Sequence, residues 1–143
     1  MHGVNRMAIE ASLTASHVAI VTLHRPELHN AFDDALIAEL TAELRRLDAD
    51  DSVRVVVLAA AGKSFSAGAD LHWMRRMAAY DEAQNLADAR ALAELMRTLD
   101  GLSKPVIAQV QGAAYGGGVG LTAARPQGTW ALLKRSEGVM ARS

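Results

Sequence analysis

The chain has 143 residues, a length that fits one domain with a sizeable hydrophobic core. Half of the residues are hydrophobic and 22% are charged, which is typical of a globular chain rather than a disordered one. Fifteen basic residues balance sixteen acidic ones, which argues against a nucleic-acid-binding protein. The absence of cysteine excludes disulfide scaffolds, thiolate metal sites and thiol nucleophiles.

A strand and a helix are predicted in the first third of the chain. Residues 17–23 form a β-branched run that ends before Pro26, where a strand must stop. Residues 31–47 have the spacing of an amphipathic helix, and Asn30 is placed to cap it. The apolar stripe of this helix consists of Phe32, Leu36, Leu40, Leu44 and Leu47.

Two apolar runs further along the chain predict buried strands. Residues 53–61 are apolar on both faces, as in a parallel sheet, and residues 106–110 form a similar run. Between these runs, helices are predicted over residues 71–80 and 81–99, the second with a stripe of leucines. Strands that alternate with helices of this length predict an α/β fold with largely parallel pairing. The leucine stripe comprises Leu86, Leu92, Leu95 and Leu99.

The sequence also bears on location and on metal binding. The first six residues lack the pattern of a signal peptide, so a cytoplasmic protein is predicted. Residues 105–124 carry no charge, but six of them are glycine or proline, which favours a strand and a buried helix over a membrane span. The five histidines have no metal-binding spacing, so no metal site is predicted.

Two loops of small residues each join a predicted buried strand to a helix. They are residues 66–70 and the Gly-Gly-Gly run at residues 116–118. Small residues let a ligand approach the main chain, and N–H groups at a helix start point outward. Two such loops facing each other could place two N–H donors on one carbonyl oxygen, which is an oxyanion hole. The glycines could equally serve tight turns and close packing, and spacing alone leaves both interpretations open.

Two other patterns are weaker. Residues 118–123 (GVGLTA) match the Gly-x-Gly-x-x-Ala dinucleotide fingerprint, and Glu137 is near the expected position of the ribose acid. Residues 125–128 do not resemble the strand that should follow, so an NAD-binding domain is the less favoured alternative. Ser64 and Ser66 lack the Gly-x-Ser-x-Gly context of a nucleophilic serine.

Three ordered motifs resemble the crotonase (enoyl-CoA hydratase/isomerase) superfamily. They are HRPELHNA at residues 24–31, FSAGADL at residues 65–71, and KPVIAQVQG at residues 104–112, followed by the glycine run at 116–118. The resemblance covers residues 17–124 and implies an α/β spiral of β-β-α units, incomplete in this chain. The segments SAGADLHWM and GGGVGL are most similar to the methylglutaconyl-CoA hydratase branch, which implies branched-chain amino acid degradation.

The resemblance implies an acyl-CoA thioester as substrate and no separate cofactor. The main-chain N–H groups of Ala69 and Gly117 would form the oxyanion hole, and full-length relatives would assemble as trimers or as dimers of trimers. The positions implied for binding coenzyme A are Glu27 and Leu28 along the adenine, Ala67 and Gly68 at the pantetheine entry, His72 near a phosphate, and Asp70 and Gly116 in the same two loops.

The end of the chain departs from the pattern of this superfamily. Gly120 and Met140 stand where hydratases carry their two catalytic glutamates. Residues 125–143 carry four basic residues against one acidic residue, whereas residues 1–124 carry eleven against fifteen. We therefore expect residues 1–124 to be the N-terminal part of a crotonase-like domain. A frameshifted or prematurely ended reading frame would explain the divergent basic tail and predicts weak or absent activity.

Two competing hypotheses remain for the chain. One is a natural short variant that only binds acyl-CoA or pairs with a partner subunit. The other is an interaction domain that binds no coenzyme A thioester at all.

Overall fold

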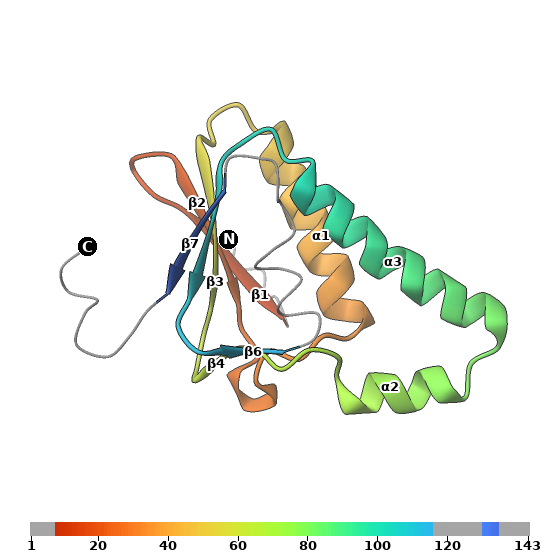
Figure 1. Cartoon of the computed structure of the whole chain (residues 1–143). Helices are drawn as coiled ribbons and strands as arrows, with labels where there is room; N and C mark the ends of the chain where they lie inside the picture. The colour runs from red at the N-terminus through yellow and green to blue at the C-terminus, as the bar shows by residue number, and fades with distance from the viewer. Residues whose placement is uncertain (1–7, 116–129, 135–143) are drawn as a thin grey trace.

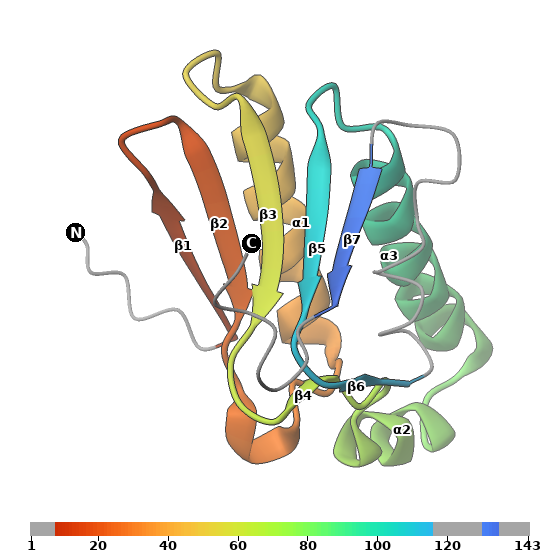
Figure 2. The same cartoon turned by 60° about the vertical axis from the view of Figure 1, so that its left-hand side comes forward.

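A five-stranded sheet forms the centre of the protein, in a computed structural model that describes residues 8–115 and 130–134 (Figure 1). β1 pairs antiparallel with β2, and all later neighbours in the sheet are parallel (Figure 2). Parallel neighbours need long crossover connections, which helices supply between β2 and β3 and between β3 and β5. In spatial order the strands are β1 (Ile9–Leu13), β2 (Val18–Leu23), β3 (Val55–Ala60), β5 (Val106–Val110) and β7 (Trp130–Lys134).

Two long helices, α1 (Asp34–Ala49) and α3 (Glu82–Asp100), pack side by side over one face of this sheet (Figures 1 and 2). The strands alternate between the two faces, so every second residue of β2, and Val56 and Leu58 of β3, are buried beneath the helices. The main core residues are Val21, Leu23, Val56 and Leu58 from the sheet, and Leu36, Leu40, Leu44, Leu47, Leu95 and Leu99 from the helices.

The opposite face of the sheet is also apolar. Ile20, Val57 and Ile107 lie in register on three neighbouring parallel strands and are half-buried. A strand that is apolar on both faces is typical of a sheet covered on both sides. The apolar residues predicted at positions 53–61 thus lie on both faces of the sheet, the face under the helices and the opposite face.

A second sheet of two short parallel strands, β4 (Ser64–Ser66) and β6 (Ala113–Ala114), lies beyond the carboxyl ends of β3 and β5 (Figure 2). The 3-10 turn η1 (Pro26–Leu28) and helix α2 (Leu71–Ala78) lie at this same end of the molecule. This end therefore gathers segments from three distant parts of the chain, and the candidate site is built there.

The element order confirms the α/β class and the β-β-α arrangement that the sequence predicts. β1, β2 and α1 form the first unit, β3, β4, α2 and α3 the second, and β5 and β6 begin a third. The sequence predicts β2, β3, β5 and all three helices, but it does not predict β1, β4, β6 or β7. β4 and β6 have three and two residues, and strands this short are defined by their partners rather than by their own composition.

Two predictions about the helices are wrong in detail. Asn30 does not cap α1, which begins at Asp34 and is capped by the Asp33 carboxylate accepting from the Leu36 N–H. Residues 31–33 are not helical, and Phe32 pairs instead with Ala69 in a parallel bridge. Leu86 is 48% exposed, because the first half of α3 extends past α1 (Figure 1).

The tail after residue 124 contributes β7, which pairs in parallel register with β5 from Val106 to Val110. The remainder of the tail lies outside the described residues, as do Gly120 and Met140. The divergent character of residues 125–143 therefore stays a prediction from the sequence.

Candidate active site at the loop of residues 66–70

Ala69 lies opposite Phe32 in an isolated parallel bridge. The Phe32 N–H donates to the Gly68 carbonyl at 2.6 Å, and the Asp70 N–H donates to the Phe32 carbonyl, also at 2.6 Å. In a parallel pair, the residue between these two bonded groups directs its own N–H away from the partner strand. The Ala69 N–H therefore points away from Phe32, and no acceptor is recorded for it among residues 8–115.

Gly68 supplies the bend that turns Ala69 outward. Its φ angle is +86°, a conformation that costs little for glycine and is strained for residues with a side chain. Gly68 itself is buried, whereas Ala67 and Ala69 on either side of it are exposed. The loop thus presents main chain to the outside through small residues, as an oxyanion-binding loop requires.

Asn30 joins the segment before α1 to the strand before the loop. It is fully buried with a φ of +53°, a conformation that asparagine tolerates better than most residues. Its side-chain oxygen accepts from the Arg25 N–H at 2.7 Å, and its amide donates to the carbonyls of Ala61 at 2.8 Å and Ser64 at 3.0 Å. Its buried side chain is thus satisfied by three main-chain partners.

Arg25 and Asp33 form an ion pair next to this junction, with Nη1 and Oδ2 2.6 Å apart. Burial acts to raise the pKa of Asp33, but the hydrogen bonds from Arg25 and the Leu36 amide, with the charges of Arg25 and Arg76, hold that pKa below its ordinary value. Asp33 is therefore ionised in the folded protein, where it caps α1 and closes the turn that holds residues 26–30.

Helix α2 starts directly after the loop. The Asp70 carboxylate is buried and accepts from the Trp73 N–H at 3.0 Å, so it caps the helix. Trp73 is buried, and its indole N–H donates to the Asp88 carboxylate at 3.1 Å, which ties α2 to α3. His72 lies in the first turn of α2 and is exposed.

Several of the positions predicted to bind the substrate lie close together, and two others are outside the described residues. Glu27 and Leu28 are exposed on η1, and the Ala67 N–H donates to the carbonyl of His29, the residue that follows this turn. The turn and the loop are thus neighbours. Gly116 and Gly117 lie outside the described residues, as does the fingerprint at residues 118–123.

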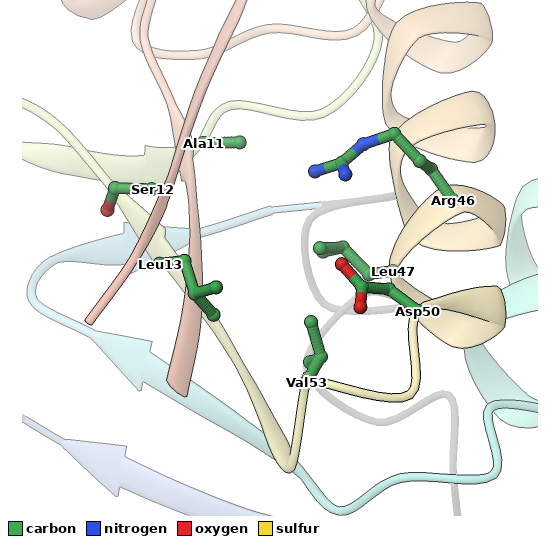
Figure 3. A pocket seen from close by; sticks show the side chains of 7 residues that line it. All are labelled: Ala11, Ser12, Leu13, Arg46, Leu47, Asp50 and Val53. Carbon is green, nitrogen blue, oxygen red and sulfur yellow. The ribbon is translucent and has the colours of Figure 1, made fainter. Parts of the chain in front are cut away.

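Two hollows among the described residues lie away from this loop. One cavity of about 140 Å³ lies between β1 and the end of α1, where Arg46 and Asp50 face the strand (Figure 3). A groove of about 290 Å³ runs between α1 and α3, and no residue of the loop lines either hollow. Within residues 8–115 and 130–134, no cluster of three histidine or acidic residues suits a metal ion, and no helix is long and apolar enough to cross a membrane.

The fold and the loop define the class of this protein: it has a mixed α/β core, and one main-chain N–H group of a loop points outward. Residues 14–125 match the family model described as enoyl-CoA hydratase/isomerase. The chain therefore belongs to the enoyl-CoA hydratase/isomerase family, as its three motifs predict. This membership argues against the dinucleotide-binding alternative. The match ends at the residue where the charge balance of the sequence changes.

Relatives and solved structures agree with this family. The mevalonyl-coenzyme A hydratase of Beauveria bassiana is 40% identical over 115 residues, which cover 77% of this chain and 41% of the relative. The 2,3-dehydroadipyl-CoA hydratase of Escherichia coli K12 is 40% identical over 101 residues, covering 71% of this chain and 38% of the relative. The chain thus spans about two fifths of the length of these relatives.

Among solved structures, an enoyl-CoA hydratase from Shewanella pealeana superposes with a TM-score of 0.81 at 44% identity. The superposition covers 84% of this chain and 45% of that structure. The crotonase fold predicted from the sequence is thereby confirmed.

Sequence reasoning missed the two polar residues that hold the loop from within. The sequence pattern predicts Asn30 as a helix cap and marks Ser66 only as a candidate nucleophile. The sequence signal for Asn30 is its residue type, because asparagine adopts a positive φ more readily than most residues. The bond from Ser66 to Asn30 has no such signal, since Asn30 lies in another segment of the chain.

Proposed function

We propose that the chain binds an acyl-CoA thioester at the loop of residues 66–70, with the Ala69 N–H donating to the thioester carbonyl, as part of an enoyl-CoA hydratase/isomerase activity. The observation that carries the proposal is the outward N–H of Ala69, which the bridge to Phe32 orients. The family resemblance supplies the second donor, the N–H of Gly117.

The chemistry of the family explains why such donors matter. Adding water across the double bond of an enoyl thioester, or removing a proton beside the thioester, builds an enolate. The negative charge of this enolate develops on the carbonyl oxygen. A preorganised N–H donor at that oxygen is worth roughly 3 kcal/mol to the transition state. The donor lies in the main chain, so no particular side chain is needed at Ala69.

The coenzyme A portion is proposed to lie across the exposed turn and loop. Glu27 and Leu28 would follow the adenine, Ala67 and Gly68 would line the path of the pantetheine, and His72 would face a phosphate. Asp70 would act indirectly, because its carboxylate caps α2. Gly116 would complete the second loop.

The proposal names the thioester rather than one acyl group, because the two relatives described above are named for different acyl groups. Crotonyl-CoA is the simplest probe of binding to the thioester, which these substrates share. Methylglutaconyl-CoA is the second, since the sequence motifs are most similar to that branch.

Nuclear magnetic resonance of the labelled chain tests the contact directly. We expect crotonyl-CoA to move the Ala69 amide proton downfield, because the N–H acquires a strong acceptor. Coenzyme A alone should move resonances of residues 27–28 and leave Ala69 unchanged. If crotonyl-CoA binds and the Ala69 amide does not move, this N–H is not an oxyanion donor. If no coenzyme A thioester binds at millimolar concentration, the proposal is wrong, and this is the result that the interaction-domain hypothesis predicts.

A pair of proline variants tests the same contact through binding affinity. Ala69→Pro removes the N–H, whereas Leu71→Pro places proline at the first position of α2, where an N–H is dispensable. We expect Ala69→Pro alone to abolish the difference in affinity between crotonyl-CoA and coenzyme A. Equal behaviour of the two variants, both folded by circular dichroism, would contradict the proposal.

A further inference from the structure

Ser66 is a fully buried serine at the end of β4, just before the loop. Its hydroxyl donates to the Asn30 carbonyl at 3.0 Å and accepts from the Gly68 N–H at 3.2 Å. One side chain therefore connects the junction at Asn30 to the bend at Gly68. A hydroxyl is suited to this place because it can donate and accept at the same time.

The two main-chain groups that Ser66 joins both have unusual backbone geometry. Asn30 and Gly68 have φ angles of +53° and +86°, so neither residue continues a regular ladder. The Gly68 N–H and the Asn30 carbonyl would otherwise face a buried environment without these partners, and buried polar groups need partners. The hydroxyl of Ser66 is thus what makes the bend compatible with burial.

The bend decides where Ala69 points. Gly68 is held on one side by the Ser66 hydroxyl and on the other by the Phe32 N–H, which donates to its carbonyl. Ala69 follows immediately, and its N–H direction is set by the orientation of the Gly68–Ala69 peptide. Oxyanion donors act through preorganisation, so a donor that samples several directions stabilises less charge.

We propose that Ser66 is a positioning residue whose hydroxyl fixes the Gly68 bend and so aims the Ala69 N–H at the thioester carbonyl. This inference rests on the proposed function of Ala69. It assigns Ser66 no contact with the substrate and no nucleophilic role, since its hydroxyl is buried and engaged with main-chain groups.

The neighbouring Ser64 offers a matched control. It lies in the same strand, and its hydroxyl is 3.0 Å from His29 Nδ1 in an exposed pair that does not involve the loop. Ser66→Ala and Ser64→Ala each remove one hydroxyl from β4. Only the first removes the link between Asn30 and Gly68.

The first measurement is the infrared carbonyl stretch of crotonyl-CoA labelled with carbon-13 at the thioester, bound to the chain. Hydrogen bonding to the carbonyl lowers this frequency. We expect Ser66→Ala to lose about half or more of the wild-type shift while the Kd changes by less than about threefold, because the donor is misdirected and the coenzyme A contacts remain. Ser64→Ala should keep the wild-type shift, and an unchanged shift in Ser66→Ala would overturn the inference.

The second measurement, amide hydrogen exchange without ligand, separates this inference from the proposed function. In the wild-type chain the Gly68 N–H should exchange more slowly than the Ala69 N–H, which has no acceptor in the described residues. In Ser66→Ala, exchange at Gly68 should rise by about tenfold or more relative to Ser64→Ala. Equal exchange of Gly68 and Ala69 in the wild type would overturn the role of Ser66, even if Ser66→Ala failed to fold.

A wild-type chain with no carbonyl shift but with the expected exchange pattern would reject Ala69 as a donor. In that case Ser66 would fix the bend without aiming a donor at a substrate, which also overturns the inference. A wild-type carbonyl shift that survives in Ser66→Ala would reject the inference alone.

Discussion

Gly112 passes so close to Lys63 that a Cβ atom at Gly112 would lie 1.9 Å from the Lys63 carbonyl oxygen. This approach brings β6 alongside β4, although the two strands belong to different β-β-α units. The small sheet that carries the loop of residues 66–70 therefore depends on a position without a side chain.

Gly112→Ala should destabilise the chain by about 2–3 kcal/mol or more, because the clash is with main-chain atoms that cannot rotate away. Urea unfolding followed by circular dichroism measures this change. Gly101→Ala is the control, since the added Cβ would lie 3.1 Å from the Arg97 carbonyl oxygen, a contact that small shifts relieve. Equal midpoints for the two variants would show that β4 and β6 are not held this closely.

Asn30→Ala should cost about 2–4 kcal/mol of unfolding free energy, because three hydrogen bonds are lost and their main-chain partners lie around a buried site. Asn30→Gly loses the same bonds but accepts the positive φ without strain. We therefore expect the glycine variant to be more stable than the alanine variant by about 1 kcal/mol. Chemical denaturation of both variants provides the comparison, and a more stable alanine variant would contradict this account of Asn30.

Asp33→Asn should lower stability at pH 7 by about 1–2 kcal/mol, because asparagine still caps α1 but cannot pair with the Arg25 charge. The pKa of Asp33 lies below its ordinary value of 3.8 in the folded chain. Its ionised form therefore stabilises the fold at pH values above 3.8, and this contribution is lost as the pH falls through the lowered folded value. The difference between wild type and variant should accordingly shrink in acid.

Unfolding curves between pH 3 and pH 7 test this dependence. Glu94→Gln is the comparison, because Glu94 pairs with Arg45 and Arg97 on the surface, where solvent weakens ion pairs. We expect a smaller effect for Glu94→Gln than for Asp33→Asn at pH 7. A pH-independent gap between wild type and Asp33→Asn would rule out the ion pair as its source.

Trp73→Phe should loosen α2 while leaving the central sheet intact. Phenylalanine keeps most of the buried ring but loses the hydrogen bond from the indole to Asp88. We expect a loss of about 1–2 kcal/mol and faster hydrogen exchange confined to α2. Asp88→Asn retains an acceptor oxygen and should change exchange less, so a reversed order would show that the charge of Asp88 matters more than the bond.

We expect this chain to hydrate crotonyl-CoA at least tenfold more slowly than a full-length relative, because the resemblance implies that Gly120 and Met140 replace the two catalytic glutamates of hydratases. A spectrophotometric assay of crotonyl-CoA and methylglutaconyl-CoA at high protein concentration measures this rate. Turnover within tenfold of the relative would show that this chain supplies a working acid or base, and Glu137 would be the first candidate to replace.

The spacing of apolar residues in the sequence is enough to predict the larger helices and strands of this protein. The leucines of α1 repeat at three and four residues and are buried, and the apolar runs of β2, β3 and β5 lie in one parallel sheet. These patterns are local, because each follows from burying one face of a single element. The three ordered motifs at residues 24–31, 65–71 and 104–112 likewise indicate the family from the sequence.

Only the tertiary structure decided how the candidate site is held. The Asn30 amide donates to the carbonyls of Ala61 and Ser64 beyond β3, Ser66 bonds back to Asn30, and the direction of the Ala69 N–H depends on Phe32. Each of these hydrogen bonds joins segments that are distant in sequence, so neither propensity nor spacing encodes them. The small polar and glycine residues that make the bonds are equally common in ordinary turns, and their partners become definite only when the chain has folded.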